Sequence, residues 1–328
     1  MLNEPFLLYP EGKDYLWGGT RLNDDFEKGI DLDPLAETWE CSTHPDGPSI
    51  VVSGAYRGQR LNKLLKDRPD FLGTHPAVEG ELPILIKFID ANKDLSVQVH
   101  PDDEYANKYE NGQLGKTEMW YVLDAAKDAH LCFGLSRDMS KEKVRKSIEE
   151  GKLEKYLQKV PVKKNDVFYI EAGTIHAIGA GTLVAEIQEN SNLTYRMYDY
   201  DRVDKNGNKR ELHVDKALEV ANLKASNSPR QPMRVLKYSR GCATEFLCRC
   251  KYFQVERMLL NTERCHEMVS FRSNELSFQV YLCIDGCGTM FYGAGGALHF
   301  FKGDCIFVPA NSVQCKFHGQ AQLLKVTA

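Results

Sequence analysis

Polar residues that could bind a metal ion stand at three separate places in the chain. Gln98 and His100 lie two residues apart in "LSVQVH", Glu118 begins "EMWYVL", and His176 follows the turn in "EAGTIH". Because side chains alternate along a strand, Gln98 and His100 would point to the same face. Two imidazoles, a carboxylate and an amide oxygen suit a divalent ion such as Zn²⁺, with a position left for water or a substrate oxygen. Each residue alone is also typical of an ordinary strand end, so the spacing leaves both interpretations open.

The segments that must position these residues are typical of short β-strands. Many short strands at regular spacing predict a sandwich or a barrel, and a barrel gathers side chains from distant segments into its mouth. Apolar or alternating runs indicate strands in the first part of the chain at 82–89, 95–100, 118–123, 166–170 and 181–189. Five further runs of this kind follow residue 250. Helices are predicted at 61–72 and at 215–223, and one or two helices at 140–160 with Ser140 as the N-cap.

A weak internal repeat links the two parts of the chain. Residues 163–178 align with residues 301–316, each reading Lys-Xaa-Asp, an apolar strand, a turn and a second strand. Gln314 occupies the position of His176 in the second copy. Two copies of one barrel, only one of which carries chemistry, would explain this pattern. The alternative is a chance likeness between short hairpins.

Composition excludes several classes of protein. With 328 residues, 42% hydrophobic and 27% charged, the chain is typical of a globular protein of one large or two ordinary domains. A net charge of −4 argues against a nucleic-acid binder, although local cations can still bind a small anion. No signal peptide and no apolar run of membrane-spanning length is found, so no membrane partner is expected. Ten cysteines without an export signal indicate reduced, structural thiols in a cytoplasmic protein.

Longer motifs around the candidate ligands resemble a known family. The segments "LSVQVHPDDEYA", "GKTEMWYVL" and "EAGTIHAIGAGTLVAEIQENSNLTYRMYDYDR" are similar, in this order, to signature segments of type I mannose-6-phosphate isomerases, or phosphomannose isomerases, of the short bacterial form. "YLWGGTRL" and "LAETWECSTHPDGPS" resemble its N-terminal blocks. The resemblance implies a mainly β cupin fold of two jelly-roll barrels with a small helical insertion near 140–160. It implies a catalytic, metal-binding domain at 1–230 and a degenerate domain without metal at 235–328.

The resemblance also implies the metal site and the reaction. The family's ligands correspond to Gln98, His100, Glu118 and His176, which would hold one Zn²⁺ per chain. The substrate would be a small sugar phosphate, because the family interconverts mannose 6-phosphate and fructose 6-phosphate. In this aldose–ketose isomerisation a proton leaves C2, a cis-enediol forms and a proton returns at C1. A divalent metal would stabilise the developing enediolate as a Lewis acid.

Four further residues correspond to positions associated with activity. Glu186 is the first candidate for the base that moves the proton, and Lys87 or Lys116 is the second. Each of these three could instead orient a metal ligand. Arg196 stays protonated and cannot be a base. It would stabilise charge, or hold the phosphate or a sugar oxygen, unless it forms a structural salt bridge to Asp199 or Asp201.

Two other functions are compatible with a cupin fold. An iron oxygenase would use a site of histidines or of two histidines and one carboxylate, whereas a glutamine ligand favours zinc. A non-catalytic sugar-phosphate-binding cupin would be marked by the loss of a ligand or of Arg196, and neither is lost.

Overall fold

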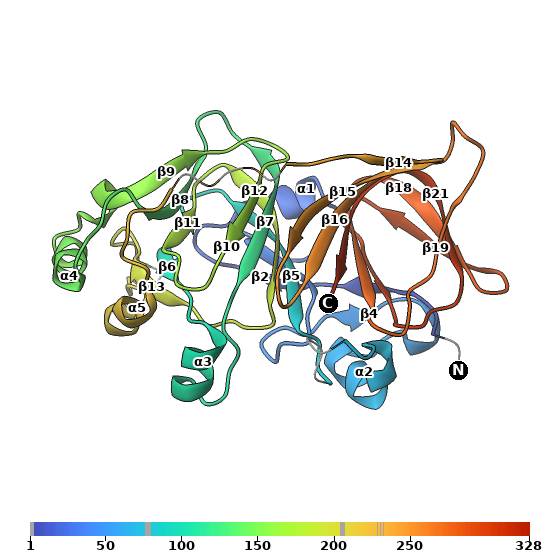
Figure 1. Cartoon of the computed structure of the whole chain (residues 1–328), viewed down its shortest axis with the longest axis horizontal. Helices are drawn as coiled ribbons and strands as arrows, with labels where there is room; N and C mark the ends of the chain where they lie inside the picture. The colour runs from blue at the N-terminus through green and yellow to red at the C-terminus, as the bar shows by residue number, and fades with distance from the viewer. Residues whose placement is uncertain (1–2, 76–79, 204–206, 228, 230, 232) are drawn as a thin grey trace.

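The computed structural model describes residues 3–75, 80–203, 207–227, 229, 231 and 233–328. The described chain is built mainly of β-strands, which form two halves side by side (Figure 1). The prediction of a mainly β protein is therefore confirmed. No helix within the described residues is long and apolar enough to cross a membrane.

Two sheets form the half of the molecule that contains most of the predicted site. The six-stranded sheet has the order β10 (Val167–Ile170), β7 (Glu118–Ala125), β12 (Thr182–Glu189), β5 (Ile84–Ala91), β3 (Glu37–Cys41) and β2 (Glu11–Lys13). The five-stranded sheet has the order β13 (Tyr195–Tyr198), β6 (Val97–Val99), β11 (His176–Ile178), β8 (His130–Leu135) and β9 (Leu157–Pro161). Ile89 and Val184 of the first sheet share one apolar core with Leu131 and Ile178 of the second, so the two sheets face each other.

The central strands of the six-stranded sheet are buried on both faces. In β5, for example, Lys87 and Ile89 face the five-stranded sheet, whereas Ile86 and Phe88 pack in a core shared with the C-terminal half. Strands buried on both sides read as nearly continuous apolar runs. A charged residue within such a run is therefore conspicuous, because burial without a partner is costly.

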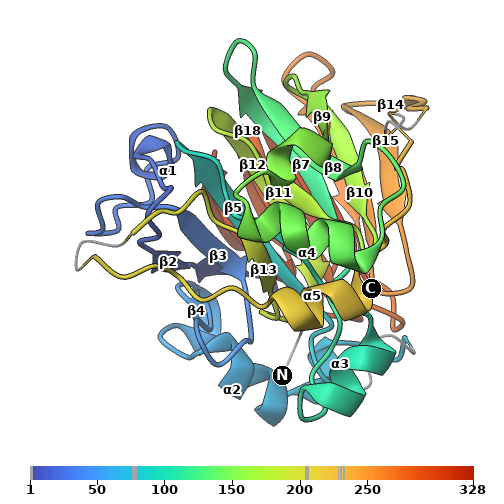
Figure 2. The same ribbon diagram turned by 90° about the vertical axis from the view of Figure 1, so that its left-hand side faces the viewer.

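Short helices cover the outer face of the five-stranded sheet (Figure 2). Helices α4 (Lys141–Glu149) and α5 (Val214–Val220) pack Val144 and Leu218 onto Val97 and Val99 of β6. The side chain of Ser140 caps α4, as predicted. The other helical segments are α1 (Arg21–Asp24), α2 (Leu61–Asp67) and α3 (Asp103–Tyr109), with 3₁₀ turns at Gly54–Tyr56, Pro69–Phe71 and Leu153–Tyr156.

The prediction of one or two helices at 140–160 agrees with α4 and the 3₁₀ turn Leu153–Tyr156, but it is wrong for the last residues. Helix α4 ends at Glu149, a 3₁₀ turn follows, and residues from Leu157 onward form β9 instead. Gly151 has a φ of 64°, which favours glycine and stops the helix. Pairing with β8 then makes this segment a strand, because tertiary hydrogen bonds outweigh weak local propensity.

A ten-stranded sheet forms the other half. Its strands are β14 (Lys237–Ser239), β15 (Cys242–Arg249), β16 (Gln254–Asn261), β21 (Cys315–Thr327), β18 (Gln279–Tyr292), β20 (Cys305–Val308), β1 (Phe6–Tyr9) and β4 (Ile50–Val51), with β17 (Val269–Phe271) beside β21 and β19 (Gly296–Phe301) beside β18. The N-terminal strand β1 pairs with β20, so the start of the chain contributes to the C-terminal sheet. The segment 224–234 is polar and has two prolines, which predicts a linker. Its residues 228, 230 and 232 lie outside the described residues.

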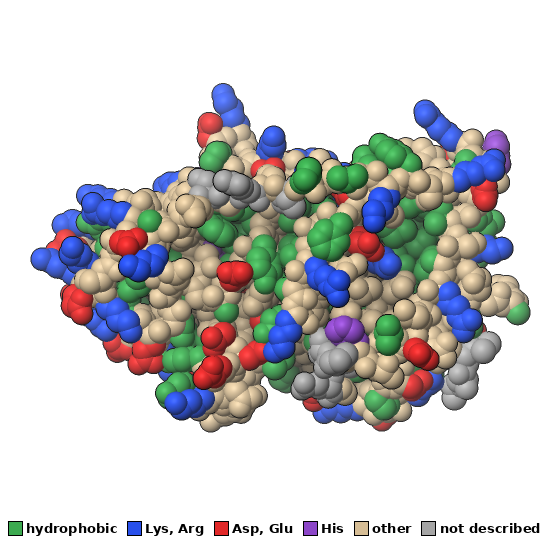
Figure 3. Space-filling view, viewed as in Figure 1, with side chains coloured by type: hydrophobic (Ala, Val, Ile, Leu, Met, Phe, Trp, Pro, Cys, Tyr) green, Lys and Arg blue, Asp and Glu red, His purple; other side chains and the backbone are tan. Residues whose placement is uncertain are grey.

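The visible surface mixes charges of both signs. Lys, Arg, Asp and Glu side chains lie together over the end of the molecule that carries α4 (Figure 3).

All ten cysteines are free, in agreement with the expected thiols. Burial raises the pKa of the Cys248 thiol to about 12, which keeps this thiol protonated at neutral pH.

Candidate functional site

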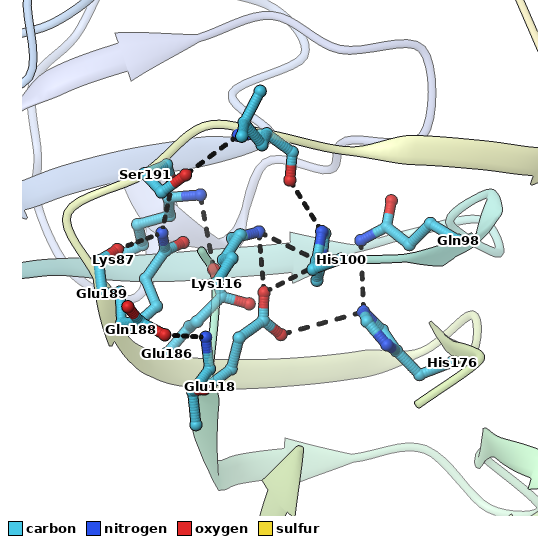
Figure 4. Close-up of polar contacts among 12 residues, drawn as sticks. Lys87, Gln98, His100, Lys116, Glu118, His176, Glu186, Gln188, Glu189 and Ser191 are labelled. Atoms are coloured by element: carbon cyan, nitrogen blue, oxygen red, sulfur yellow. Dashed lines mark hydrogen bonds and ion pairs between the residues drawn. The ribbon is translucent and has the colours of Figure 1, made fainter. Parts of the chain in front are cut away.

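Three of the predicted ligands meet between the two facing sheets. The ligand atoms of His100, Glu118 and His176 all lie within 4.8 Å of one another, and all three side chains are buried. His100 Nε2 is 3.2 Å from Glu118 Oε1, and His176 Nε2 is 3.8 Å from Glu118 Oε2 (Figure 4). The fold thus brings together residues from positions 100, 118 and 176 of the chain.

Strand pairing explains this meeting. His176 in β11 stands directly opposite Gln98 in β6, so their side chains share one face of the five-stranded sheet. His100 follows β6 immediately, two residues after Gln98. Glu118 begins β7 in the opposite sheet and points back toward the two imidazoles (Figure 4).

Backbone carbonyls orient both histidines. His100 Nδ1 is 2.7 Å from the carbonyl oxygen of Leu193, and His176 Nδ1 is 2.8 Å from that of Thr174. A carbonyl can only accept, so Nδ1 carries the proton and Nε2 has a free lone pair directed at the cluster. Burial, followed by the charge of Lys116, lowers the pKa of His100 to about 3, which keeps this imidazole neutral. Neutral imidazole is the form that binds a metal.

The carboxylate of Glu118 is ionised and incompletely hydrogen-bonded. Burial by itself would raise its pKa, but the charge of Lys116 holds the pKa well below the usual range. Lys116 Nζ is 2.6 Å from Oε1, yet neither oxygen has a hydrogen bond of good geometry to any residue that the structure describes. Two neutral imidazoles and a buried carboxylate with unused lone pairs fit a divalent cation such as zinc.

Gln98 lies beside this cluster. Its Nε2 is 3.4 Å from His176 Nε2, and Ser96 Oγ is 3.5 Å from its Oε1. In this orientation the amide presents its nitrogen to His176. A half-turn of the amide exchanges nitrogen and oxygen and would offer a neutral oxygen ligand instead.

A second group of buried charges adjoins the first. Lys87 Nζ lies 3.3 Å from Glu186 Oε1 and 3.6 Å from Glu37 Oε2. The indole nitrogen of Trp120 donates a hydrogen bond of 2.8 Å to Glu186 Oε2. Burial, followed by the charge of Glu118, raises the pKa of Glu186, so this carboxylate is a stronger base than an exposed one.

A cavity of about 240 Å³ joins the two groups. Six of the eight predicted site residues line it: Lys87, Gln98, Lys116, His176, Glu186 and Arg196. The other two, His100 and Glu118, are almost completely buried behind this wall. Convergent polar groups in one small cavity are typical of a small-molecule site.

Arg196 lies on the cavity wall, and no carboxylate of the described residues forms an ion pair with it. Its Nε donates to Ser96 Oγ at 3.3 Å, and its Nη1 donates to the carbonyl oxygen of Glu211 at 3.0 Å. Asp199, which the sequence offered as a partner, instead binds Arg202 and Arg210. Burial and the neighbouring Arg210 lower the pKa of Arg196, and both effects favour the approach of an anion.

Sequence reasoning missed several residues of this cavity. Tyr15, Glu37, Ser96 and Arg210 all line it, and none was singled out. Ser96 precedes Gln98 by two residues, so period-two spacing could have found it. Glu37 lies within "LAETWEC", where a carboxylate interrupts an apolar strand.

Comparison with known proteins agrees with this geometry. Residues 6–135 match the family model of the phosphomannose isomerase type I catalytic domain. The chain is 38% identical to a mannose-6-phosphate isomerase of Bacillus subtilis over 99% of both chains.

Two solved structures extend the likeness to the fold. The crystal structure of a mannose 6-phosphate isomerase from Bacillus subtilis superposes with a TM-score of 0.89 at 34% identity, over 98% of this chain and 99% of that one. A zinc-bound mannose 6-phosphate isomerase shares the fold alone, with a TM-score of 0.75 at 15% identity over 98% and 99% of the two chains. The predicted cupin-type fold is thereby confirmed, and the chain belongs to the type I phosphomannose isomerase family.

Proposed function

We propose that this chain is an enzyme that interconverts mannose 6-phosphate and fructose 6-phosphate. The observation that carries the proposal is the buried cluster of His100, Glu118 and His176 beside a polar cavity, in a chain of this family. The cavity also holds a buried carboxylate, Glu186, and the guanidinium of Arg196, which forms no ion pair with a carboxylate of the described residues. Sugar-phosphate isomerisation needs a base and an anion-binding group, and these residues supply both.

The proposed cofactor is one zinc ion per chain. His100, Glu118 and His176 would hold it, with Gln98 as a weaker fourth ligand because its amide oxygen is neutral. When bound, the ion would supply Lewis acidity that polarises the sugar carbonyl and makes the C2 proton more acidic. The donor set favours zinc, and a related protein of the same fold binds it.

The proposed base is Glu186. A carboxylate held by the Trp120 indole and by Lys87 has a fixed orientation, which general-base catalysis requires. It would take the proton from C2 and return it at C1, and the reverse reaction would use the same group. Lys87 would keep its charge in place, because the carboxylates of Glu37, Glu186 and Glu118 raise its pKa despite burial.

Lys116 and Arg196 have proposed roles in positioning. Lys116 Nζ, 2.6 Å from Glu118 and 3.4 Å from His100 Nε2, would hold the ligand carboxylate or bind a sugar oxygen. Arg196 would bind the substrate phosphate, since a guanidinium forms strong charge-assisted hydrogen bonds to phosphate oxygens. We further propose that residues 235–328 support the catalytic unit by packing, because Val255 and Leu282 share a core with its six-stranded sheet.

A coupled assay tests the proposal. The purified, zinc-loaded chain should convert mannose 6-phosphate to fructose 6-phosphate, and unphosphorylated mannose should react much more slowly. Chelation should abolish turnover, and added zinc should restore it, while circular dichroism shows that the fold persists. Arg196→Met should weaken substrate binding and leave zinc content unchanged. A zinc-loaded, folded chain that binds the sugar phosphate without converting it would refute the proposal and favour a binding protein.

A further inference from the structure

We infer that Glu37 is a positioning residue for the isomerisation, because it shares the Lys87 ammonium with Glu186 and so keeps Glu186 free to exchange a proton. The inference rests on the proposed function and adds a residue to it. Glu37 is 7% exposed and lines the same cavity as Lys87 and Glu186.

The register of three neighbouring strands places Lys87 between the two carboxylates. Strand β5 pairs with β3 on one side and with β12 on the other. Glu186 stands directly opposite Lys87 across the β5–β12 pair. On the other side, Trp39 stands opposite Lys87, and Glu37 lies two residues away on the same face. The three charged side chains are between 4% and 9% exposed.

Each carboxylate has its own indole donor. Trp39 Nε1 donates to Glu37 Oε2 at 2.8 Å, and Trp120 Nε1 donates to Glu186 Oε2 at the same distance. The Lys87 ammonium also lies over the Trp39 ring, 5.1 Å from its centroid. Because both indoles are buried within the sheet, the carboxylates are fixed and the ammonium is held between them.

The distances show that the ammonium is shared. Nζ is 3.3 Å from Glu186 and 3.6 Å from Glu37, and both separations exceed those of a tight charge-assisted hydrogen bond. A carboxylate in a tight, exclusive ion pair is a weak base, because the pair stabilises its ionised form. Glu37 therefore opposes a tight pair between Lys87 and Glu186. Without its charge, the ammonium would move toward Glu186 and lower its basicity.

The decisive variant is Glu37→Gln in the zinc-loaded protein. We expect kcat to fall about three- to tenfold for a base weakened by about one pKa unit, with KM within about twofold of wild type. Zinc content should be unchanged. With mannose 6-phosphate deuterated at C2, the isotope effect on kcat should increase, because a weaker base makes proton transfer more nearly rate-limiting.

Matched variants separate this role from a structural one. Glu11→Gln removes an exposed carboxylate from the adjacent strand β2 and should leave kcat unchanged. Glu37→Asp keeps the negative charge, and its kcat should lie between those of wild type and Glu37→Gln. If Glu37→Gln does not fold, Glu37→Asp should still show a raised isotope effect at unchanged KM. In a Lys87→Met background, Glu37→Gln should lower kcat by less than about twofold, because the shared ammonium is gone.

Three results would overturn the inference: a Glu37→Gln kcat within about twofold of wild type, a loss of zinc that accounts for the lost activity, or the same cost of Glu37→Gln with and without Lys87. An inactive wild-type protein would instead refute the proposed function itself.

Discussion

Replacing Glu186 with glutamine removes the proposed base and leaves its surroundings nearly intact. Glutamine has almost the same shape, and its carbonyl oxygen can still accept the 2.8 Å hydrogen bond from Trp120. Lys87 keeps Glu37 as a partner at 3.6 Å, so no buried ammonium is stranded. The cluster that would hold zinc does not include Glu186. The variant should therefore fold and retain its zinc.

The expected size of the effect follows from these interactions. A general base contributes roughly 10²-fold or more to turnover, which corresponds to about 2.7 kcal/mol at about 1.36 kcal/mol per tenfold change. Stability should change much less. Burial raises the pKa of Glu186, so the fold already disfavours its charge. A neutral side chain escapes that penalty, which offsets its weaker attraction to the Lys87 ammonium, and the melting temperature should shift by only a few degrees.

Turnover in deuterated water, followed by nuclear magnetic resonance, provides the assay. Wild type should place deuterium at C2 of mannose 6-phosphate or C1 of fructose 6-phosphate, and Glu186→Gln should do so at least about 10²-fold more slowly. Glu189→Gln is the matched control, because Glu189 is a buried carboxylate on the same strand that does not line the cavity.

Two outcomes would contradict the proposed base and the proposed enediol, respectively. A zinc-loaded Glu186→Gln variant with more than about a tenth of wild-type turnover would show that Glu186 is not the base. Turnover by wild type without any solvent deuterium in the products would indicate a hydride shift and would exclude the enediol.

Further predictions concern the metal, pH and the thiols. Glu118→Ala should lose both zinc and activity by elemental analysis and assay, whereas Gln98→Ala should lose less of each, because an amide oxygen is the weaker ligand. Burial, followed by the charge of Asp103, raises the pKa of Glu189 from an ordinary 4.5 to about 8, so the folded state holds a proton that the unfolded chain releases. Stability should thus fall between pH 5 and 8, and a flatter melting-temperature profile is expected for Glu189→Gln. Cys250→Ser should fold and turn over normally, since this half-buried thiol does not line the cavity.

The sequence alone was sufficient to predict the residues of the buried cluster and the strands on which most of them lie. Period-two spacing put Gln98 and His100 on one face, and Glu118 at the start of an apolar run marked a strand that enters the core. Both expectations rest on local geometry, because alternation along a strand depends only on neighbouring residues. The long motifs around these residues identified the family, and the full-length likeness to a known member confirms it.

Local patterns were less reliable where distant pairing decides the structure. Residues 157–160 continue a helical pattern but form part of β9, because β8 offers them a hydrogen-bonding edge. Similarly, β1 near the N-terminus completes the C-terminal sheet by pairing with β20. No short window of sequence contains the partner strand in either case.

The working arrangement of the site was decided only by the tertiary structure. Alternation specifies the face of a strand on which a residue lies, but not which other strand that face meets. The carbonyl oxygens of Thr174 and Leu193 fix the imidazoles through the backbone, which leaves no signature in residue type. Glu37 gains its proposed importance only because β5 lies between β3 and β12, so that one buried ammonium serves two carboxylates from segments about 150 residues apart.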